Sequence, residues 1–183
     1  MRAVLPLEAS LVGTEQIGTL LAGGVDGDVR ALAVSGDNVY AGGSFHSAEG
    51  ITASNIARWD GTNWHALAGG VSEWVCGIAD CFDDATVRTL AIGPGGLYIG
   101  GDLTEVDGMA ISSIAKWDGT GWSALGGGLP GYNEGVHALA TQETNVFVGG
   151  NLRWVPGFRG PGLAKWDGST WSAISESDFE RRR

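Results

Sequence analysis

The chain has 183 residues, a formal net charge of −10 and only 17% charged residues, and it contains 32 glycines and eight tryptophans. The excess of acidic residues excludes the broad basic surface that non-specific nucleic-acid binding needs, and it disfavours anionic membrane surfaces. No apolar run in the sequence approaches the ~20 residues of a membrane-spanning helix, so we expect neither nucleic-acid binding nor membrane insertion.

The chain begins with a segment that shows no strong period. Residues 1–14 predict an N-terminal extension, and they make a poor signal peptide because Pro6 and Glu8 break a short apolar patch. Residues 15–25, EQIGTLLAGGV, end like two later segments, HALAGGV at 65–71 and SALGGGL at 123–129. They therefore predict an additional N-terminal strand, equivalent to the last strand of a repeat whose earlier part is absent.

Three copies of one pattern follow, and they start at Val29, Val87 and Val136. The first copy contains VRALAVSG, NVYAGGSF, NIARWDG and TNWHAL, and the other two match it closely. Each copy therefore offers four short strand candidates. The Asp-Gly pair between the third and fourth candidates is a strong hairpin signal, because both residues tolerate positive φ. The first strand candidate carries apolar residues on both faces, such as Ala31 on one and Leu32 on the other, which predicts that both faces are buried.

A tandem period of about 50 residues without helical periodicity indicates a propeller or solenoid. The domain prediction is a repeat segment over residues 15–175, followed by a C-terminal tail over 176–183. Within the segment we predict the extra strand at 15–25, four-stranded antiparallel units at 26–71, 87–129 and 136–175, and an insertion at 72–86.

The conserved spacing of glycine and tryptophan resembles the kelch repeat, and Ala-Arg/Lys-Trp-Asp-Gly with a closing Gly-rich turn looks closer still to bacterial secreted propellers and the cortical cell-polarity marker family. The resemblance implies an all-β propeller of three four-stranded blades plus the N-terminal strand. It also implies a binding or scaffold role and no catalysis, since few such propellers are enzymes. The residues that carry it are Gly42, Gly43, Trp59, Asp60, Gly61, Trp64, Gly100, Gly101, Trp117, Asp118, Gly119, Trp122, Gly149, Gly150, Trp166, Asp167, Gly168 and Trp171.

These repeated residues have a physical explanation. Paired glycines remove side chains where neighbouring strands or blades come close. The tryptophans on either side of each Asp-Gly turn can pair across the hairpin. We therefore interpret the whole set as structural rather than ligand-binding.

Three blades are few for a closed ring, which has about four to eight. The chain is then a piece of a longer propeller, or one of two copies that complete a ring as a homo-oligomer, or an open arc with exposed blade faces. The first two solutions are favoured, because exposed blade faces are an aggregation liability.

The insertion holds the chain's two cysteines, Cys76 and Cys81. A loop disulfide is the favoured interpretation and indicates an extracellular or periplasmic protein, while a pair of free thiols remains the alternative. A zinc site would lack two ligands, so we expect no metal and no cofactor. The acidic residues Asp80, Asp83 and Asp84, and likewise Asp102, Glu105 and Asp107, match no Ca²⁺ loop and are interpreted as solvated loops.

The loops that differ between copies are where binding to a protein or glycan partner is expected. The sequence GNLRWVPGFRGPG supplies a cluster of aromatic and basic residues, and GGSFHS supplies the neighbouring Phe45 and His46. Catalytic motifs such as a Gly-x-Ser-x-Gly elbow are absent from the sequence. The prediction is a non-enzymatic binding module, and the alternative is the propeller part of a secreted glycan-active enzyme. Its candidate contact residues are Arg153, Trp154, Phe158, Arg159, Phe45 and His46.

Overall fold

The computed structural model describes residues 23–72, 74–76, 81–83, 85–129, 135–152 and 162–174, and in 74–76 and 81–83 it describes the backbone alone. These residues form strands and turns and no helix, so the prediction of an all-β chain is confirmed. Within the described ranges there is accordingly no helix that could cross a membrane.

Most strands belong to three four-stranded antiparallel sheets, which follow one another along the chain. Sheet 1 contains β1 (Asp28–Ser35), β2 (Asn38–Ser44), β5 (Ile56–Trp59) and β6 (Trp64–Ala66). Sheet 2 contains β10 (Thr86–Gly93), β11 (Gly96–Asp102), β14 (Ile114–Trp117) and β15 (Trp122–Ala124). Sheet 3 contains β16 (Val136–Gln142), β17 (Asn145–Gly150), β18 (Gly162–Trp166) and β19 (Trp171–Ala173).

The three sheets share one strand order and one register. In each sheet the first two strands pair with a bulge near the start, between Val29 and Ala31 in sheet 1 and at the matching residues of the other two. A bulge brings two residues of one strand opposite one residue of its partner. The bulge places the first valine of the strand on the same face as the leucine three residues later.

Smaller strands connect and extend the sheets. β3 (Ser47–Ala48) pairs with β4 (Ile51–Thr52), and β12 (Glu105–Val106) pairs with both β7 (Val71–Ser72) and β13 (Met109–Ala110). The insertion forms a hairpin of β8 (Trp74–Cys76) and β9 (Cys81–Asp83). Of the predicted strand at 15–25, Val25 forms an isolated bridge with Ala48, and 15–22 lie outside the described residues, as do the predicted extension 1–14 and tail 176–183.

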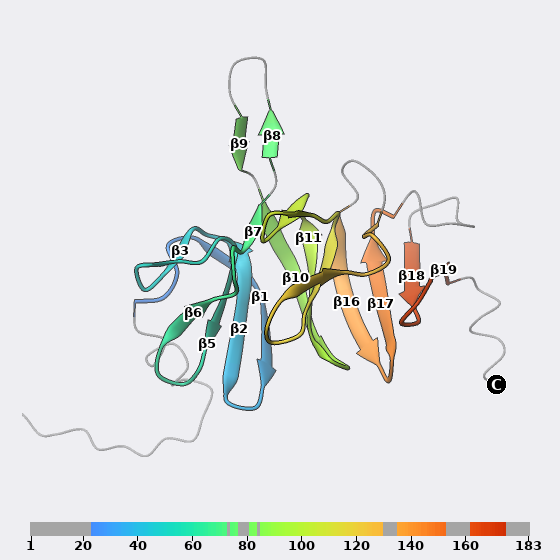
Figure 1. The fold of residues 1–183 in the computed structure, drawn as a ribbon, viewed down its shortest axis with the longest axis horizontal. Coiled ribbons are helices and arrows are strands. Elements are labelled where there is room, and N and C mark those ends of the chain that lie inside the picture. Colours follow the sequence, from blue (N-terminus) through green and yellow to red (C-terminus); the bar gives the residue numbers. More distant parts are fainter. Residues whose placement is uncertain are drawn as a thin grey trace, which may run out of the picture.

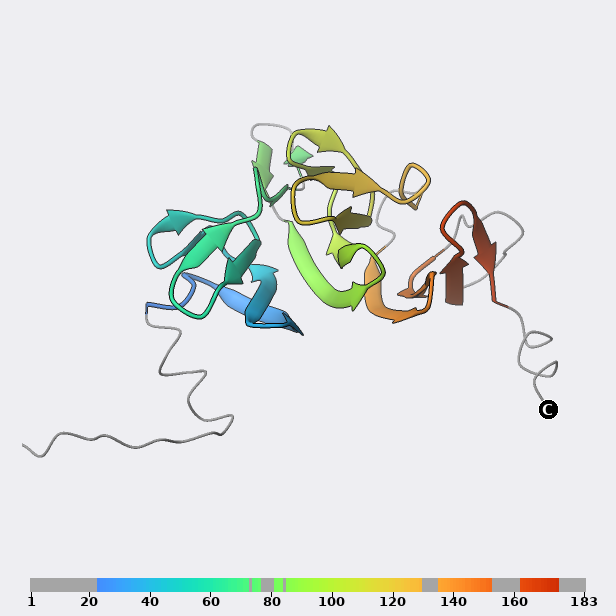
Figure 2. The ribbon, with the colours of Figure 1, turned by 60° about the horizontal axis from the view of Figure 1, so that its bottom comes forward.

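The three sheets lie side by side along an arc (Figures 1 and 2). The first strands β1, β10 and β16 line the inner side of the arc, and the last strands lie toward its outer side (Figure 2). Two core clusters lie between neighbouring sheets: one joins Ile56 and Leu67 to Val87 and Ile99, and the other joins Ile114 to sheet 3. A third cluster lies within sheet 1 and its loops. The ends of the arc are therefore sheets with a neighbour on one side only.

The position of sheet 1 at one end of the arc explains one wrong prediction. Both faces of the first strand were expected to be buried, but Val29, Leu32 and Val34 of β1 are exposed. The matching valine of β10, Val87, is fully buried because sheet 1 covers it. Sheet 1 is at the end of the arc, so no other described sheet covers the face of β1 that points away from sheet 2.

A pair of tryptophans closes the outer hairpin of each sheet. Their ring centroids lie 5.7 Å apart for Trp59 and Trp64, 5.2 Å for Trp117 and Trp122, and 5.4 Å for the pair in sheet 3, with the planes tilted by 49–59°. Tilted aromatic pairs at this separation add about 0.5–1.5 kcal/mol beyond area burial. These pairs fix the outer edge of each sheet.

The aspartate of each Asp-Gly turn accepts hydrogen bonds from its own loop. Asp118 Oδ1 accepts from the Thr120 hydroxyl at 2.7 Å, the Thr120 amide at 2.8 Å and the Gly121 amide at 2.9 Å. These bonds stabilise the charged carboxylate and lower the pKa of Asp118 to about 2, with the Thr120 hydroxyl as the largest cause. The same arrangement holds the pKa values of Asp60 and Asp167 well below the usual range.

These turns predict a loss of stability in acid. Because the folded pKa of Asp118 lies below its unfolded value of about 3.9, its contribution is complete above pH ~4 and is lost as the pH falls toward 2. Asp118→Asn keeps the Oδ1 acceptor but does not titrate, so its urea midpoint should fall less between pH 4 and pH 2 than that of the wild type. Asp118→Ala, which removes the acceptor, should be destabilised at every pH; a wild-type acid slope in Asp118→Asn would contradict this explanation.

Candidate binding site

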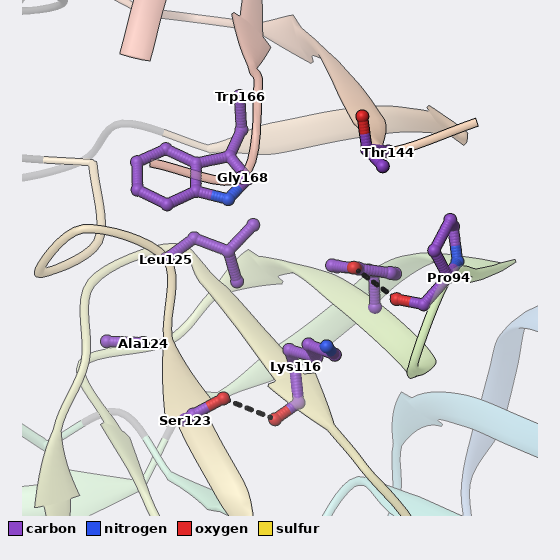
Figure 3. A pocket seen from close by; sticks show the side chains of 9 residues that line it. Pro94, Lys116, Ser123, Ala124, Leu125, Thr144, Trp166 and Gly168 are labelled. Atoms are coloured by element: carbon purple, nitrogen blue, oxygen red, sulfur yellow. Dashed lines mark hydrogen bonds between the residues drawn. The ribbon is translucent and has the colours of Figure 1, made fainter. Parts of the chain in front are cut away.

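A pocket of about 320 Å³ opens between sheets 2 and 3. Sheet 2 supplies Tyr98, Lys116 and residues 123–125, together with Pro94 of the β10–β11 turn. Sheet 3 supplies Thr144 from the β16–β17 turn, Trp166 from the end of β18 and Gly168 from the β18–β19 turn (Figure 3). The pocket therefore exists only because two sheets pack side by side.

The sheet 2 wall is a row of residues across three adjacent strands. Tyr98 on β11 pairs with Lys116 on β14, and Lys116 pairs with Ser123 on β15. The Tyr98 hydroxyl donates to the Pro94 carbonyl at 2.9 Å, and burial raises the pKa of the phenol. The Lys116 ammonium lies 5.7 Å from the centre of the Tyr98 ring, within the range of a cation–π contact. This wall presents a half-buried ammonium beside an exposed serine hydroxyl.

The sheet 3 wall is formed by the indole of Trp166. A Cβ on Gly126 would lie 2.7 Å from a ring carbon of Trp166, so the missing side chain makes room for the ring. Trp171 packs against Trp166 and donates its Nε1–H to the Leu125 carbonyl at 2.8 Å. The half-buried Trp166 ring is thus held between sheet 3 and the last turn of sheet 2, beside Leu125 (Figure 3).

The pocket lining combines two aromatic side chains, one ammonium and three hydroxyl groups, and the Tyr98 hydroxyl among them is already bonded to the Pro94 carbonyl. Its volume is at the lower end of the range for small-molecule sites, which is about 300–1,000 Å³. An aromatic face binds the apolar side of a ring or chain, and the ammonium and hydroxyls bind acceptor oxygens. The arrangement suits one sugar ring or one side chain of a protein partner.

The structure places the candidate residues from the variable loops in different environments. Phe45 is wrong as a contact residue, because its side chain is only 1% exposed and packs in the core of sheet 1. Its equivalents Leu103 and Leu152 are also buried. The shared apolar character of these three positions was the signal for a core residue. His46 is exposed on the loop beside it.

The remaining candidates are only partly described. Arg153, Trp154, Phe158 and Arg159 lie outside the described residues. The backbone of the β8–β9 hairpin places Cys76 directly opposite Cys81, while their side chains lie outside the described part of the chain. Among the described residues no group of histidine, cysteine or carboxylate side chains could hold a metal ion.

The sequence did not identify the pocket. Trp166 and Gly168 were interpreted as structural residues of the repeat. The two walls come from different copies of the pattern, so no single motif contains the site. The chain matches no protein-family model, no curated protein and no solved structure.

Proposed function

We propose that this chain is a kelch-like propeller segment that acts as a non-enzymatic binding module for a protein or glycan. Three four-stranded antiparallel sheets of one register, which follow an arc, support the propeller. The observation that carries the binding role is the pocket between sheets 2 and 3, with Trp166 and Lys116 on its opposite walls.

A binding role is favoured over a catalytic one because the acidic side chains of the repeats already serve the fold. The Oδ1 atoms of Asp60, Asp118 and Asp167 accept amide and hydroxyl hydrogen bonds within their own turns. A glycosidase would need two carboxylates placed across a cleft. The pocket lining contains a lysine and hydroxyl groups but no carboxylate. The ligand's oxygens are then bound, and the lining offers no carboxylic acid to protonate a glycosidic leaving group.

The test is a screen of the chain on glycan and protein arrays, followed by titration of each hit against two matched pairs of variants. Trp166→Ala should weaken binding by about ten-fold or more, because it removes the aromatic wall. Trp117→Ala is the matched control, since it breaks the equivalent tryptophan pair in sheet 2 without touching the pocket lining. A comparison of Lys116→Gln with Lys165→Gln tests the positive charge in the same way, because Lys116 lines the pocket and Lys165 is its equivalent in sheet 3.

Three results would contradict the proposal. Equal loss of binding in Trp166→Ala and Trp117→Ala would place the site elsewhere. Absence of any hit on both arrays would leave a structural role. Turnover of a bound glycan would favour the alternative, a propeller part of a glycan-active enzyme.

A further inference from the structure

The contact between neighbouring sheets is made twice in this chain in the same way. A Cβ on Gly42 of sheet 1 would lie 2.5 Å from the Val87 Cγ1 of sheet 2, and a Cβ on Gly100 of sheet 2 would lie 2.4 Å from the Val136 Cγ1 of sheet 3. Both valines are fully buried. The first-strand valine of each following sheet therefore packs onto a second-strand glycine of the sheet before it.

A hydrogen bond accompanies each of these contacts. Trp122 Nε1 donates to the Leu67 carbonyl at 3.0 Å, and Trp171 Nε1 donates to the Leu125 carbonyl at 2.8 Å. In both cases a tryptophan of the following sheet binds the residue directly after the last strand of the preceding sheet. The two interfaces thus consist of the same apolar contact and the same polar contact.

Sheet 1 carries one half of this interface without a partner. Val29, Leu32 and Val34 are 45%, 59% and 62% exposed, and they stand where Val87, Leu90 and Ile92 pack in sheet 2. The equivalent tryptophan of sheet 1, Trp64, is buried, and in the described part of the chain its Nε1 is the buried side-chain donor that lacks a hydrogen bond.

Sheet 3 carries the other half. Among the described residues, a Cβ on Gly149 would meet Leu163 and Ala138 of the same sheet, whereas Gly42 and Gly100 meet a valine of the next sheet. Leu163 is 45% exposed, while its equivalents Ile56 and Ile114 are fully buried. Ile174 ends WSAI at the position that Leu67 and Leu125 occupy in WHAL and WSAL.

We propose that these two faces bind each other between two copies of the chain. In the pair, Val29 packs onto Gly149 of the partner subunit, and Trp64 Nε1 donates to the carbonyl of Ile174 of the partner subunit. The contact is head to tail and forms twice, so that two copies close a ring of six sheets. This inference rests on the sheet faces and is independent of the pocket and its ligand.

A competing occupant is residues 15–22 of the same chain, where Leu21 of TLLAGGV also matches Leu67. That segment corresponds in sequence to a last strand only. In both internal interfaces the glycine that receives the valine belongs to a second strand, β2 or β11. The second copy is favoured because sheet 3 supplies both the glycine and the terminal carbonyl.

The test measures the mass of the full-length chain by light scattering over a range of concentrations. The wild type should approach twice the chain mass of 18.9 kDa. Leu32→Asp and, independently, Gly149→Val should weaken association by about ten-fold or more, because one places a charge in the contact and the other fills the receiving site. Met109→Asp is the matched control, an exposed apolar residue of β13 away from both faces, and it should keep the wild-type mass.

The indole N–H of Trp64 gives a second readout by NMR. Its protection from solvent exchange should rise with protein concentration in the wild type and not in Leu32→Asp. A mass of one chain at every concentration would overturn the proposal, as would a mass that grows beyond two chains. Protection that does not depend on concentration would overturn it in favour of residues 15–22. Circular dichroism of both variants verifies that they fold, so that a lost dimer reports on the interface.

Discussion

Gly101→Ala should destabilise the chain by about 3 kcal/mol or more, a loss that places it among the most severe single substitutions. A Cβ on Gly101 would lie 2.0 Å from the Thr86 carbonyl oxygen and 2.9 Å from the Arg88 amide nitrogen. Both are backbone atoms of β10 at its bulge, so no side-chain rotation relieves the clash. The strand pair would have to separate where sheet 2 begins.

The measurement is the urea midpoint and slope at neutral pH. Gly121→Ala is the matched control, because a Cβ there meets nothing within 4 Å and its φ is not in the left-handed region. Its stability should stay within about 0.5 kcal/mol of the wild type. Similar stabilities for the two variants would show that the bulge is not as closely packed as its backbone distances indicate. Gly43 and Gly150 hold the matching positions of the other sheets.

Much of the scaffold follows from local sequence signals. Hairpins with Asp-Gly turns, strands with aromatic and β-branched residues, and glycine pairs were all identified, since each signal is contained within one short segment. The pairing of Trp59 with Trp64 across such a turn needs only the hairpin register. These features repeat, so one correct interpretation applies to each of the three sheets.

The features that sequence did not reveal depend on contacts between distant segments. Whether Leu32 is buried depends on a neighbouring sheet, and its own strand pattern is the same as that of Leu90. The pocket requires Trp166 and Lys116 to face each other across two sheets. Phe45 was misjudged because glycine and serine precede it and suggest a loop, whereas the chain turns its ring into the core.

Asn55 is a further residue that sequence alone did not single out. The equivalent positions hold Ser113 and Gly162, so no shared residue type marks it. The structure shows why this position matters: Asn55 and Ser113 adopt φ values of 63° and 64°, in the left-handed region. Asparagine tolerates this conformation better than most residues with a side chain. Asn55 and Ser113 therefore share a backbone conformation rather than a residue type.

Asn55→Ala should destabilise the chain by about 2–4 kcal/mol, since it strains the backbone and leaves buried polar groups without a partner. Asn55 is 6% exposed. Its Oδ1 accepts from the Phe45 amide at 3.0 Å, and its Nδ2 donates to the Val71 carbonyl at 2.9 Å. Val71 lies on β7, where the chain leaves sheet 1 for sheet 2, so this side chain connects the loop after β2 to that crossing.

Two further variants separate the causes in the same urea experiment. Asn55→Gly loses both side-chain hydrogen bonds but accepts positive φ, so it should be more stable than Asn55→Ala by about 1 kcal/mol. Asn38→Ala removes an amide with two long hydrogen bonds, one donated to the Ser35 carbonyl and one accepted from the Arg58 guanidinium, each at 3.4 Å, and it should cost at most about 0.5 kcal/mol. If Asn55→Ala were no more destabilising than Asn38→Ala, the buried amide would not hold the crossing. Equal stability of Asn55→Ala and Asn55→Gly would instead assign the whole loss to the hydrogen bonds, because the two variants differ only in how they tolerate the left-handed backbone.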